Sequence, residues 1–290
     1  MRTAVVIPTY QEAMNIDTSV RRVRRFVPAA DVLVVDDNSP DGTAALADGL
    51  GAELGQVFVL RRPERQGLGP AYRAGWAWAL ERHYDVIVSM DADGSHNAAS
   101  LPDLLSAIDG GADLVMGSRY IPGGSVPGWP LHRLALSRGG NRYASAVLGL
   151  PVHDATGGYR AYRADLLRRI DLSTLRANGY GFQIELVHRA VMLGARVVEV
   201  PITFVDRELG ESKMSASIIS EALALVTWWS VRDRLLPQTA RTRRGGLRPE
   251  QGLSPDEGLS PEEGLGPEKG LSPEEGLKPK EGLKPKEGLS

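Results

Sequence analysis

The sequence contains no cysteine among its 290 residues. A disulfide framework, a thiolate metal site and a cysteine nucleophile are therefore all excluded. No uninterrupted apolar run reaches the roughly 18 residues that a membrane-spanning helix needs, so no such helix is predicted. The chain passes from Met1 into an apolar strand at Thr3 with no secretory signal before it. Together with the lack of cysteine, this favours a cytoplasmic location.

Most of the chain also has no large excess of positive or negative charge. Residues 1–245 carry 28 Lys and Arg against 26 Asp and Glu, a net charge of +2, whereas residues 246–290 carry 6 against 10, a net charge of −4. A nearly neutral body lacks the basic surface that general nucleic-acid binding requires, so no nucleic acid is expected as a partner. Specific binding of an anion must come from individually placed arginines.

The acidic end of the chain is a short repeat. From Gly246 the motif Gly-Leu-x-Pro-x-x occurs seven times in succession. The regularly spaced prolines prevent a helix, and one leucine per repeat buries too little surface to offset the entropy of ordering the chain. We predict three parts: a folded domain over 1–217, an amphipathic helix over 218–240 and a disordered tail over 241–290.

Strand and helix patterns alternate through the first 120 residues. Strands are predicted at Thr3–Ile7, Val32–Val35, Val57–Leu60, Val86–Met90 and Asp113–Met116, and helices at 15–25, Thr43–Leu54, Leu68–His83 and Leu101–Ile108. This order is typical of an α/β protein with a mainly parallel sheet and helices on both faces. The later part is less regular, with predicted helices at Arg133–Leu148 and within Gly179–Leu193, mixed loop and strand at His153–Tyr162, and a strand at Val197–Val200.

The predicted helix Ile218–Leu236 is dense in apolar residues, including the pair Trp228 and Trp229, and several arginines follow it. Two interpretations remain open for it. The helix packs on the sheet, or it lies in a membrane interface, where tryptophan beside arginine is common. The two are compatible, because opposite faces of one helix can do both.

Polar clusters follow four of the predicted strands. They are Pro8–Glu12, Asp36–Asp41, Asp91–His96 and Gly117–Arg119. In parallel sheets, ligands bind beyond the carboxyl ends of the strands, where these clusters would meet. The sequence therefore predicts one site at this edge of the sheet.

Asp91 and Asp93 follow the apolar strand Val86–Met90 directly. Residues i and i+2 of an extended chain point to the same side, so both carboxylates can approach one cation. Hard oxygen ligands of this kind suit Mg²⁺ or Mn²⁺ holding a phosphate group. A turn that merely ends the strand is the structural alternative, and the three other clusters on the same edge favour the site.

Several motifs together resemble a known family. Pro8-Thr9-Tyr10-Gln11-Glu12, Val35-Asp36-Asp37-Asn38-Ser39-Pro40-Asp41-Gly42-Thr43, Asp91-Ala92-Asp93 and Gly117-Ser118-Arg119-Tyr120 are similar, in this order, to motifs of the family-two glycosyltransferases. Asp154–Tyr162 and Gly179–Gln183 resemble the subgroup that transfers mannose to dolichyl or polyprenyl phosphate. The resemblance covers about residues 3–235 and leaves out the tail.

The resemblance implies a Rossmann-like GT-A fold, with a nucleotide half over about 1–120 and an acceptor half over about 121–217. It also implies inverting, metal-dependent transfer of mannose from GDP-mannose to a polyprenyl (dolichyl-type) phosphate. Two alternatives stay open: a UDP-glucose or other nucleotide-sugar donor, and a non-catalytic nucleotide-sugar-binding regulatory subunit. The lipid acceptor implies a peripheral position at the cytoplasmic face of the membrane, reached by the chain alone or with a separate membrane subunit.

The resemblance also implies residue roles on the donor side. The matched donor-binding residues are Pro8, Tyr10, Glu12, Val35, Asp37, Asp91, Ala92, Asp93, Arg207 and Lys213. Asp91 and Asp93, with Ser95 beside them, would hold Mg²⁺ or Mn²⁺. Ser95 stands where similar enzymes often carry glutamine, and its shorter side chain leaves direct coordination open. Arg207 and Lys213 match a loop that closes on the diphosphate.

On the acceptor side, Arg119, Arg133 and Ser137 match the residues that hold the lipid phosphate, and Arg119 joins Asp91 and Asp93 as a catalytic residue. A phosphate monoester is already anionic near neutral pH, so positioning by cations matters more than deprotonation by a base. Arg133 and Ser137 are spaced i, i+4, so both can face one phosphate if this segment is helical.

The remaining polar residues of the matched motifs have less definite roles. Because the acceptor needs no base, Asp154 is interpreted as a sugar contact or a structural group. Gln183 and Glu185 are candidate contacts to the sugar. No role is assigned to His96 or His153, since single histidines in loops are common.

Overall fold

The computed structural model describes residues 1–175, 177, 179–206 and 216–235. Its contacts divide the chain into two units, Met1–Thr242 and Arg243–Ser290. The second unit lies outside the described residues, and so does the whole tail predicted over 241–290. Arg207 and Lys213 are also outside them. Within the described part of the chain, no helix is both long and apolar enough to cross a membrane.

Seven strands of the described residues form one sheet in the order β3-β2-β1-β4-β6-β5-β7. The strands are β1 Thr3–Thr9, β2 Asp31–Asp36, β3 Val57–Arg61, β4 Val86–Ser89, β5 Leu114–Ser118, β6 Arg160–Arg163 and β7 Val197–Pro201. The α-helices are α1 Ile16–Phe26, α2 Thr43–Leu54, α3 Leu68–Glu81, α4 Leu101–Asp109, α5 Leu131–Leu148, α6 Ala164–Ile170, α7 Gly179–Met192 and α8 Ala216–Leu235. The predicted strands and helices are confirmed, with bounds that differ by a few residues.

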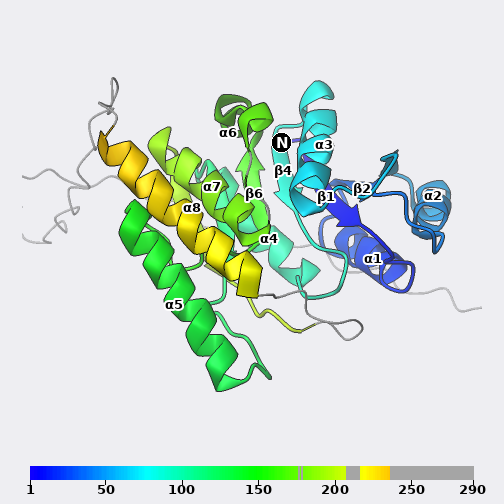
Figure 1. Cartoon of the computed structure of the whole chain (residues 1–290). Helices are drawn as coiled ribbons and strands as arrows, with labels where there is room; N and C mark the ends of the chain where they lie inside the picture. The colour runs from blue at the N-terminus through cyan, green and yellow to red at the C-terminus, as the bar shows by residue number, and fades with distance from the viewer. Residues whose placement is uncertain (176, 178, 207–215, 236–290) are drawn as a thin grey trace, which may run out of the picture. The chain divides into compact units, whose positions relative to one another are not determined.

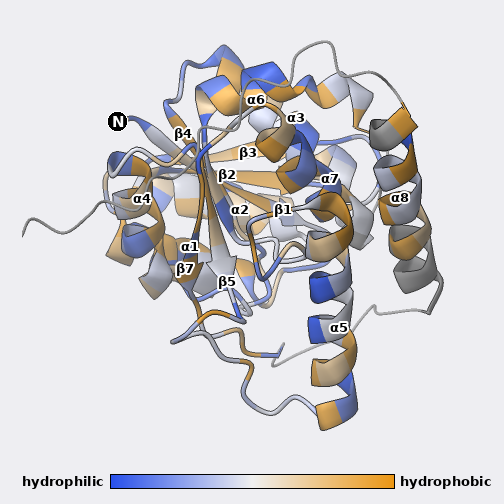
Figure 2. Ribbon diagram, turned by 90° about the vertical axis from the view of Figure 1, so that its left-hand side faces the viewer, coloured by the Kyte–Doolittle hydropathy of each residue, from blue (hydrophilic) through white to orange (hydrophobic). Residues whose placement is uncertain are grey.

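The sheet separates two apolar cores, because successive side chains of a strand point to opposite faces. Ala4 and Val6 of β1 belong to a core built with α3, α5, α6, α7 and α8. Val5 and Ile7 of the same strand belong to a second core built with α1, α2 and α4. Figure 2 shows the apolar strands between these two sets of helices. The predicted α/β fold with helices on both faces is confirmed.

Strand β6 is antiparallel to both of its neighbours, β4 and β5. Its first residue, Arg160, is paired with Ser89 near the end of β4 and with Met116 of β5. The amino end of β6 therefore lies at the same edge of the sheet as the carboxyl ends of the parallel strands. The segment before β6, predicted only as mixed loop and strand, is thereby brought to the edge where the polar clusters meet.

Helix α3 lies unusually close to the sheet because of Gly75. A Cβ atom at this position would lie 2.4 Å from Cγ1 of Val6 and 2.9 Å from Cγ2 of Val35, which is closer than carbon atoms can pack. Tyr72, one turn earlier on the same helix, is completely buried and reaches the end of β4. The close approach of α3 thus helps to position the predicted site.

Helix α8 packs against α5 and α7 (Figure 1). Val226 and Trp229 of α8 are buried in the core, whereas Trp228, Val231 and Leu235 are exposed. One face of this helix is therefore packed, as one interpretation predicted, but mainly against α5 and α7 and not on the sheet itself.

Candidate active site

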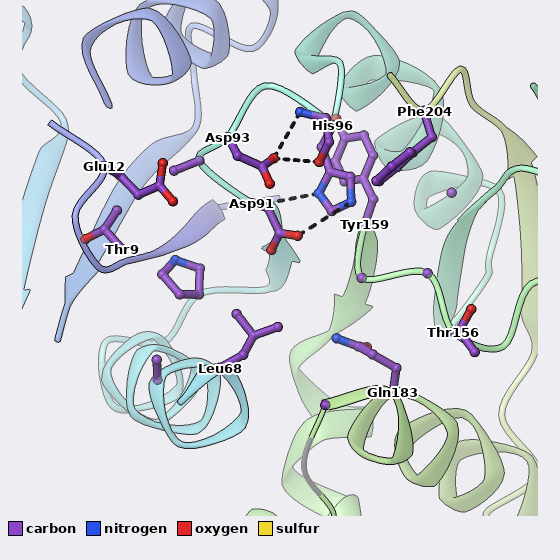
Figure 3. A pocket seen from close by; sticks show the side chains of 18 of the residues that line it. Thr9, Glu12, Leu68, Asp91, Asp93, His96, Thr156, Tyr159, Gln183 and Phe204 are labelled. Atoms are coloured by element: carbon purple, nitrogen blue, oxygen red, sulfur yellow. Dashed lines mark hydrogen bonds and ion pairs between the residues drawn. The ribbon is translucent and has the colours of Figure 1, made fainter. Parts of the chain in front are cut away.

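A cavity of about 570 Å³ opens at the carboxyl ends of β1, β4 and β5 (Figure 3). The predicted site residues that line it are Pro8, Tyr10, Glu12, Asp37, Asp91, Ala92, Asp93, Ser95, Arg119 and Arg133. Val35 and Ser137 are not among the lining residues. The tertiary structure therefore brings most of the predicted donor, metal and acceptor residues to one cavity.

A residue of α3 holds the Asp91 carboxylate. The Tyr72 hydroxyl donates a hydrogen bond to Oδ1 of Asp91 at 2.9 Å. Burial, and secondarily the negative charge of Asp91, raise the pKa of Tyr72 well above its ordinary value, so the phenol stays a neutral donor. Tyr72 is therefore a positioning residue for Asp91 that the sequence analysis did not identify.

His96 supports Asp91 from the other side. The backbone N–H of Asp91 donates to Nδ1 of His96 at 3.0 Å, which places the ring proton on Nε2. The ring is stacked on Tyr159, with ring centroids 4.8 Å apart, and meets the edge of Phe204. A lone histidine in a loop gives no sequence signal for this role, because both aromatic partners come from distant parts of the chain.

Asp93 is held by its own turn. The backbone N–H and the hydroxyl of Ser95 donate to Oδ1 of Asp93 at 3.0 and 2.6 Å. Gly94 between them has a φ of +78°, a conformation that favours glycine. The hydroxyl of Ser95 is thus used to orient Asp93, and its coordination of a metal stays a prediction.

The carboxylate pair fits a phosphate-bridged divalent cation. Asp91 and Asp93 lie on one wall of the cavity (Figure 3). The described residues contain no group of three or more His, Cys, Asp or Glu side chains that could hold a metal alone. Mg²⁺ commonly binds through one or two carboxylates and completes its coordination with substrate phosphates and water, so two carboxylates suit such an ion.

Another part of the cavity is lined by residues at the ends of β1 and β2, among them Tyr10 and Asp37. Asp37 is paired with Arg62 at 2.5 Å and accepts the backbone N–H of Gln66 at 3.2 Å. Arg65, which the sequence analysis did not identify, covers the ring of Tyr10 at 4.2 Å from its centroid. Val35 is completely buried, so its side chain packs in the core instead of lining the cavity.

Arg119 is buried against Asp154. Its Nε and Nη2 atoms donate to the two carboxylate oxygens at 2.7 Å each, and its backbone N–H donates at 3.0 Å. Burial would raise the pKa of Asp154, but the charge and hydrogen bonds of Arg119 outweigh it, so the pKa is lowered. Glu199 of β7 accepts the backbone N–H of Asp154 at 2.9 Å. Asp154 does not line the cavity, and these contacts favour the structural interpretation over a contact to the sugar, which stays a prediction.

Arg133 lines the cavity from α5. It makes a bidentate ion pair with Asp206, at 2.6 and 2.9 Å, and its guanidinium lies 3.9 Å from the ring centroid of Trp129. Ser137, one turn further along α5, instead hydrogen-bonds the hydroxyl of Tyr120 at 2.5 Å. The helix predicted for Arg133 and Ser137 is confirmed, but only Arg133 faces the cavity.

The two candidate sugar contacts on α7 differ in position. Gln183 lines the cavity. Glu185 does not, and its carboxylate accepts hydrogen bonds from Arg189 at 2.5 Å and from the backbone N–H of Ala177 at 3.1 Å. Among the unpredicted lining residues, Trp129 and Phe204 come from irregular segments whose sequence patterns carry no signal of a binding role.

A mainly parallel sheet with a carboxylate pair and two arginines around one cavity at its carboxyl edge defines a glycosyltransferase of the GT-A class. The chain belongs to glycosyl transferase family 2, whose family model matches residues 4–171.

Two named relatives each match 81% of the chain. The polyprenol monophosphomannose synthase of Mycolicibacterium smegmatis is 54% identical over 235 residues, covering 81% of this chain and 89% of that protein. The undecaprenyl-phosphate mannosyltransferase of Micrococcus luteus is 53% identical over 234 residues, covering 81% and 96%. A solved mannosyltransferase of Pyrobaculum calidifontis, in complex with GDP-Man and Mn²⁺, shares the fold with a TM-score of 0.51, 18% identity, and coverage of 80% and 72%.

Proposed function

We propose that this glycosyltransferase moves mannose from GDP-mannose to a polyprenyl phosphate. The observation that carries the proposal is that one cavity joins a carboxylate pair, Asp91 and Asp93, to two arginines, Arg119 and Arg133. The carboxylate pair suits a nucleotide diphosphate with its cation, and the two arginines suit the phosphate of an acceptor. Both named relatives transfer mannose and carry a polyprenyl acceptor in their names.

The reaction is a single displacement at the sugar. An oxygen of the acceptor phosphate forms a bond to C1 of mannose while the bond from C1 to the β-phosphate oxygen of GDP breaks, so the configuration at C1 inverts. The acceptor oxygen is already ionised near neutral pH and requires no general base. Arg119 and Arg133 orient this oxygen, and Asp154 keeps Arg119 in place through its two carboxylate contacts.

The leaving-group side depends on the acidic pair. Asp91 and Asp93 would hold Mg²⁺ or Mn²⁺, which when bound neutralises the diphosphate and makes GDP a better leaving group. The solved relative from Pyrobaculum calidifontis contains Mn²⁺ and GDP-Man, but that likeness concerns the fold. The case for a cation here rests on the two carboxylates and on Tyr72 and His96, which hold Asp91 from two sides.

Transfer is tested with the purified chain, labelled GDP-mannose, Mn²⁺ and undecaprenyl phosphate, by counting label in the lipid phase. Asp91→Asn should lower transfer by about 100-fold or more, since a metal ligand is lost. Asp48→Asn, at a half-exposed aspartate of α2, should leave transfer unchanged. Failure of the wild-type chain to label the lipid over a range of Mg²⁺ and Mn²⁺ concentrations contradicts the proposal.

The transfer assay, together with nucleotide binding, distinguishes two other functions from this one. A UDP-glucose:polyprenyl-phosphate transferase would bind UDP in preference to GDP and would label the lipid from UDP-glucose. A regulatory subunit would bind the nucleotide sugar but transfer none of it. The acidic pair and the arginines lining one cavity favour catalysis over regulation.

A further inference from the structure

A second cavity, of about 290 Å³, is formed by residues of α6, α7 and α8 and of the turn after α7. Figures 1 and 2 show α7 between the other two helices. The residues of α7 that line this cavity begin at Glu185, whereas Gly179 and Gln183 of the same helix line the candidate active site. The two cavities share no lining residue, so the second is a separate feature of the molecule.

Positive side chains outnumber negative ones in this second cavity. Three arginines line it, one from each helix: Arg169 of α6, Arg189 of α7 and Arg232 of α8. Its lining residues include a single carboxylate, Glu185, which is paired with Arg189 at 2.5 Å. Arg169 and Arg232 add positive charge beyond this pair. The cavity therefore favours an anion as its ligand.

The guanidinium groups of Arg189 and Arg169 differ in what they already contact. Arg189 donates to the Glu185 carboxylate and to the backbone carbonyl of Thr174 at 3.0 Å, so it braces the structure. Within the described residues, Arg169 makes no ion pair, and its guanidinium donates one hydrogen bond, to the backbone carbonyl of Leu193 at 2.6 Å. A guanidinium has five N–H donors, so Arg169 keeps donors for a ligand. Its side chain is exposed and can be reached from solvent.

The remainder of the cavity wall is mainly apolar and aromatic. His188 and Trp229 are buried with their rings stacked, at 6.1 Å between centroids, and Ile170 and Leu193 also line the cavity. A small inorganic anion would leave this apolar surface in contact with water. An anionic group carried by an apolar molecule would cover it, which is more favourable.

Arg232 connects the cavity to the exposed apolar face of α8. Its guanidinium lies 5.1 Å from the ring centroid of Trp228, which is 57% exposed. Val231 and Leu235, the other members of that face, are also exposed. An apolar chain that leaves the cavity past Arg232 would therefore meet apolar side chains. A phosphate held by arginines beside an apolar helix face is the arrangement expected for an anionic lipid at a membrane interface.

We propose that this second cavity binds the phosphate group of an anionic phospholipid, with Arg169 and Arg232 as its cationic contacts. Such a lipid would hold the carboxyl-terminal half of α8 at the membrane and leave the candidate active site open to its substrates. This binding is independent of the sugar and of the acceptor that the enzyme uses. It differs from general attraction to a charged surface, because a cavity takes up one headgroup and can be saturated.

The test measures binding of dihexanoyl phosphatidylglycerol to the full chain by calorimetry, below the concentration at which this lipid forms micelles. A monomeric lipid offers no charged surface, so saturable binding reports a site. Arg169→Gln and Arg232→Gln, which each remove one charge from a different helix, should weaken binding about tenfold, as loss of a charge-assisted hydrogen bond predicts. Arg169→Lys keeps the charge and should lose less. Dihexanoyl phosphatidylcholine and inorganic phosphate should bind the wild type more weakly than phosphatidylglycerol does.

Arg168→Gln is the matched control. Arg168 is the neighbouring residue of α6, is paired with Asp165 at 2.6 Å and does not line the cavity. This variant should bind the lipid as the wild type does.

Several results would overturn the proposed lipid site. They are no binding of the lipid by the wild type, equal binding of inorganic phosphate, and unchanged binding in both Arg169→Gln and Arg232→Gln. Binding that is lost only in Arg133→Gln would place the lipid in the candidate active site instead. A chain that shows the expected pattern but transfers no mannose would contradict the proposed function and leave the lipid site standing.

Discussion

Arg119 and Asp154 form a buried ion pair at the site, although Asp154 does not line the cavity. Arg119 is 7% exposed and Asp154 is completely buried. Removing one partner of a buried ion pair leaves the other charge without compensation, which is far more costly than breaking a surface pair. Under the proposed function, we therefore expect stability and acceptor orientation to be coupled at this pair of residues.

Asp154→Asn should destabilise the fold by about 3 kcal/mol at pH 7, because Arg119 stays buried and charged. Since the pKa of Asp154 is lowered from its ordinary 3.8, the ion pair contributes its full stability above that pH and loses it as the pH falls through the lowered value. Urea unfolding should therefore show a large difference between variant and wild type at pH 7 that narrows below pH 3.8. A difference independent of pH would contradict this account.

Under the proposed function, Tyr72 would influence cation binding through its hydrogen bond to Asp91. Tyr72→Phe removes the hydroxyl that orients Oδ1 of Asp91, and loss of such a supporting contact typically weakens metal binding by about tenfold. We expect the Mn²⁺ concentration for half-maximal transfer to rise by this factor, with little change in maximal rate. Tyr143→Phe removes a hydroxyl bonded to Thr227 on α8 and serves as the control. Equal Mn²⁺ requirements in both variants would show that Tyr72 is only structural.

At the scale of elements, α5 and the segment after β7 meet at the acceptor side. Arg133 of α5 is held by Asp206, which also accepts a hydrogen bond from Nε1 of Trp129 at 3.1 Å. A carboxylate that pairs with an arginine through both oxygens has the geometry in which arginine also binds phosphate. The two anions would therefore compete for Arg133.

Asp206→Asn should remove this competition. Because the Asp206 side chain is 46% exposed, its pair with Arg133 is worth about 1 kcal/mol at most, so the KM for undecaprenyl phosphate should fall by about threefold. The KM for GDP-mannose should stay as in the wild type. Initial rates at varied acceptor concentrations measure both constants. A higher acceptor KM would mean that Asp206 supports the phosphate site instead of competing for it.

At the scale of the whole folded unit, α5 and α8 lie side by side (Figure 1). Both helices expose apolar residues. Trp228, Val231 and Leu235 are spaced as one face of α8, and Leu131 and Leu136 of α5 are also exposed. An apolar helix face with tryptophan and arginine is typical of binding in the membrane interface. The guanidinium of Arg232 lies 5.1 Å from the ring centroid of Trp228. Peripheral binding to a membrane therefore stays our proposal.

Trp228→Ser should reduce binding to vesicles that contain anionic lipid by about fivefold, since a large exposed aromatic side chain is lost. Flotation of the full chain with such vesicles measures this. Leu46→Ser, at an exposed apolar residue of α2, should float like the wild type. If the wild-type chain does not float at all, a separate membrane subunit becomes the better explanation of access to the lipid.

The local pattern of the sequence determined the α/β alternation, the helices on both faces and the acidic pair that follows β4. These features could be predicted because the periodicities of strands and helices, and the motifs at strand ends, are properties of short segments. Membership of the family followed from the order of those motifs. The predicted meeting of Asp91 and Asp93 with the other polar clusters needed only the rule that carboxyl ends of parallel strands meet at one edge. The predicted role of Arg133 came from the resemblance to the family.

Only the tertiary structure decided which distant groups complete the cavity. The antiparallel insertion of β6 carries Gly157 and Gly158 to the site, Asp206 comes to Arg133 from 73 residues away, and Tyr159 and Phe204 enclose His96. These contacts depend on strand order and packing between segments far apart in the chain. No local sequence period encodes such contacts. Gln183 could be suspected from the sequence, but the burial of its Oε1 atom without a hydrogen bond is visible only in the tertiary structure.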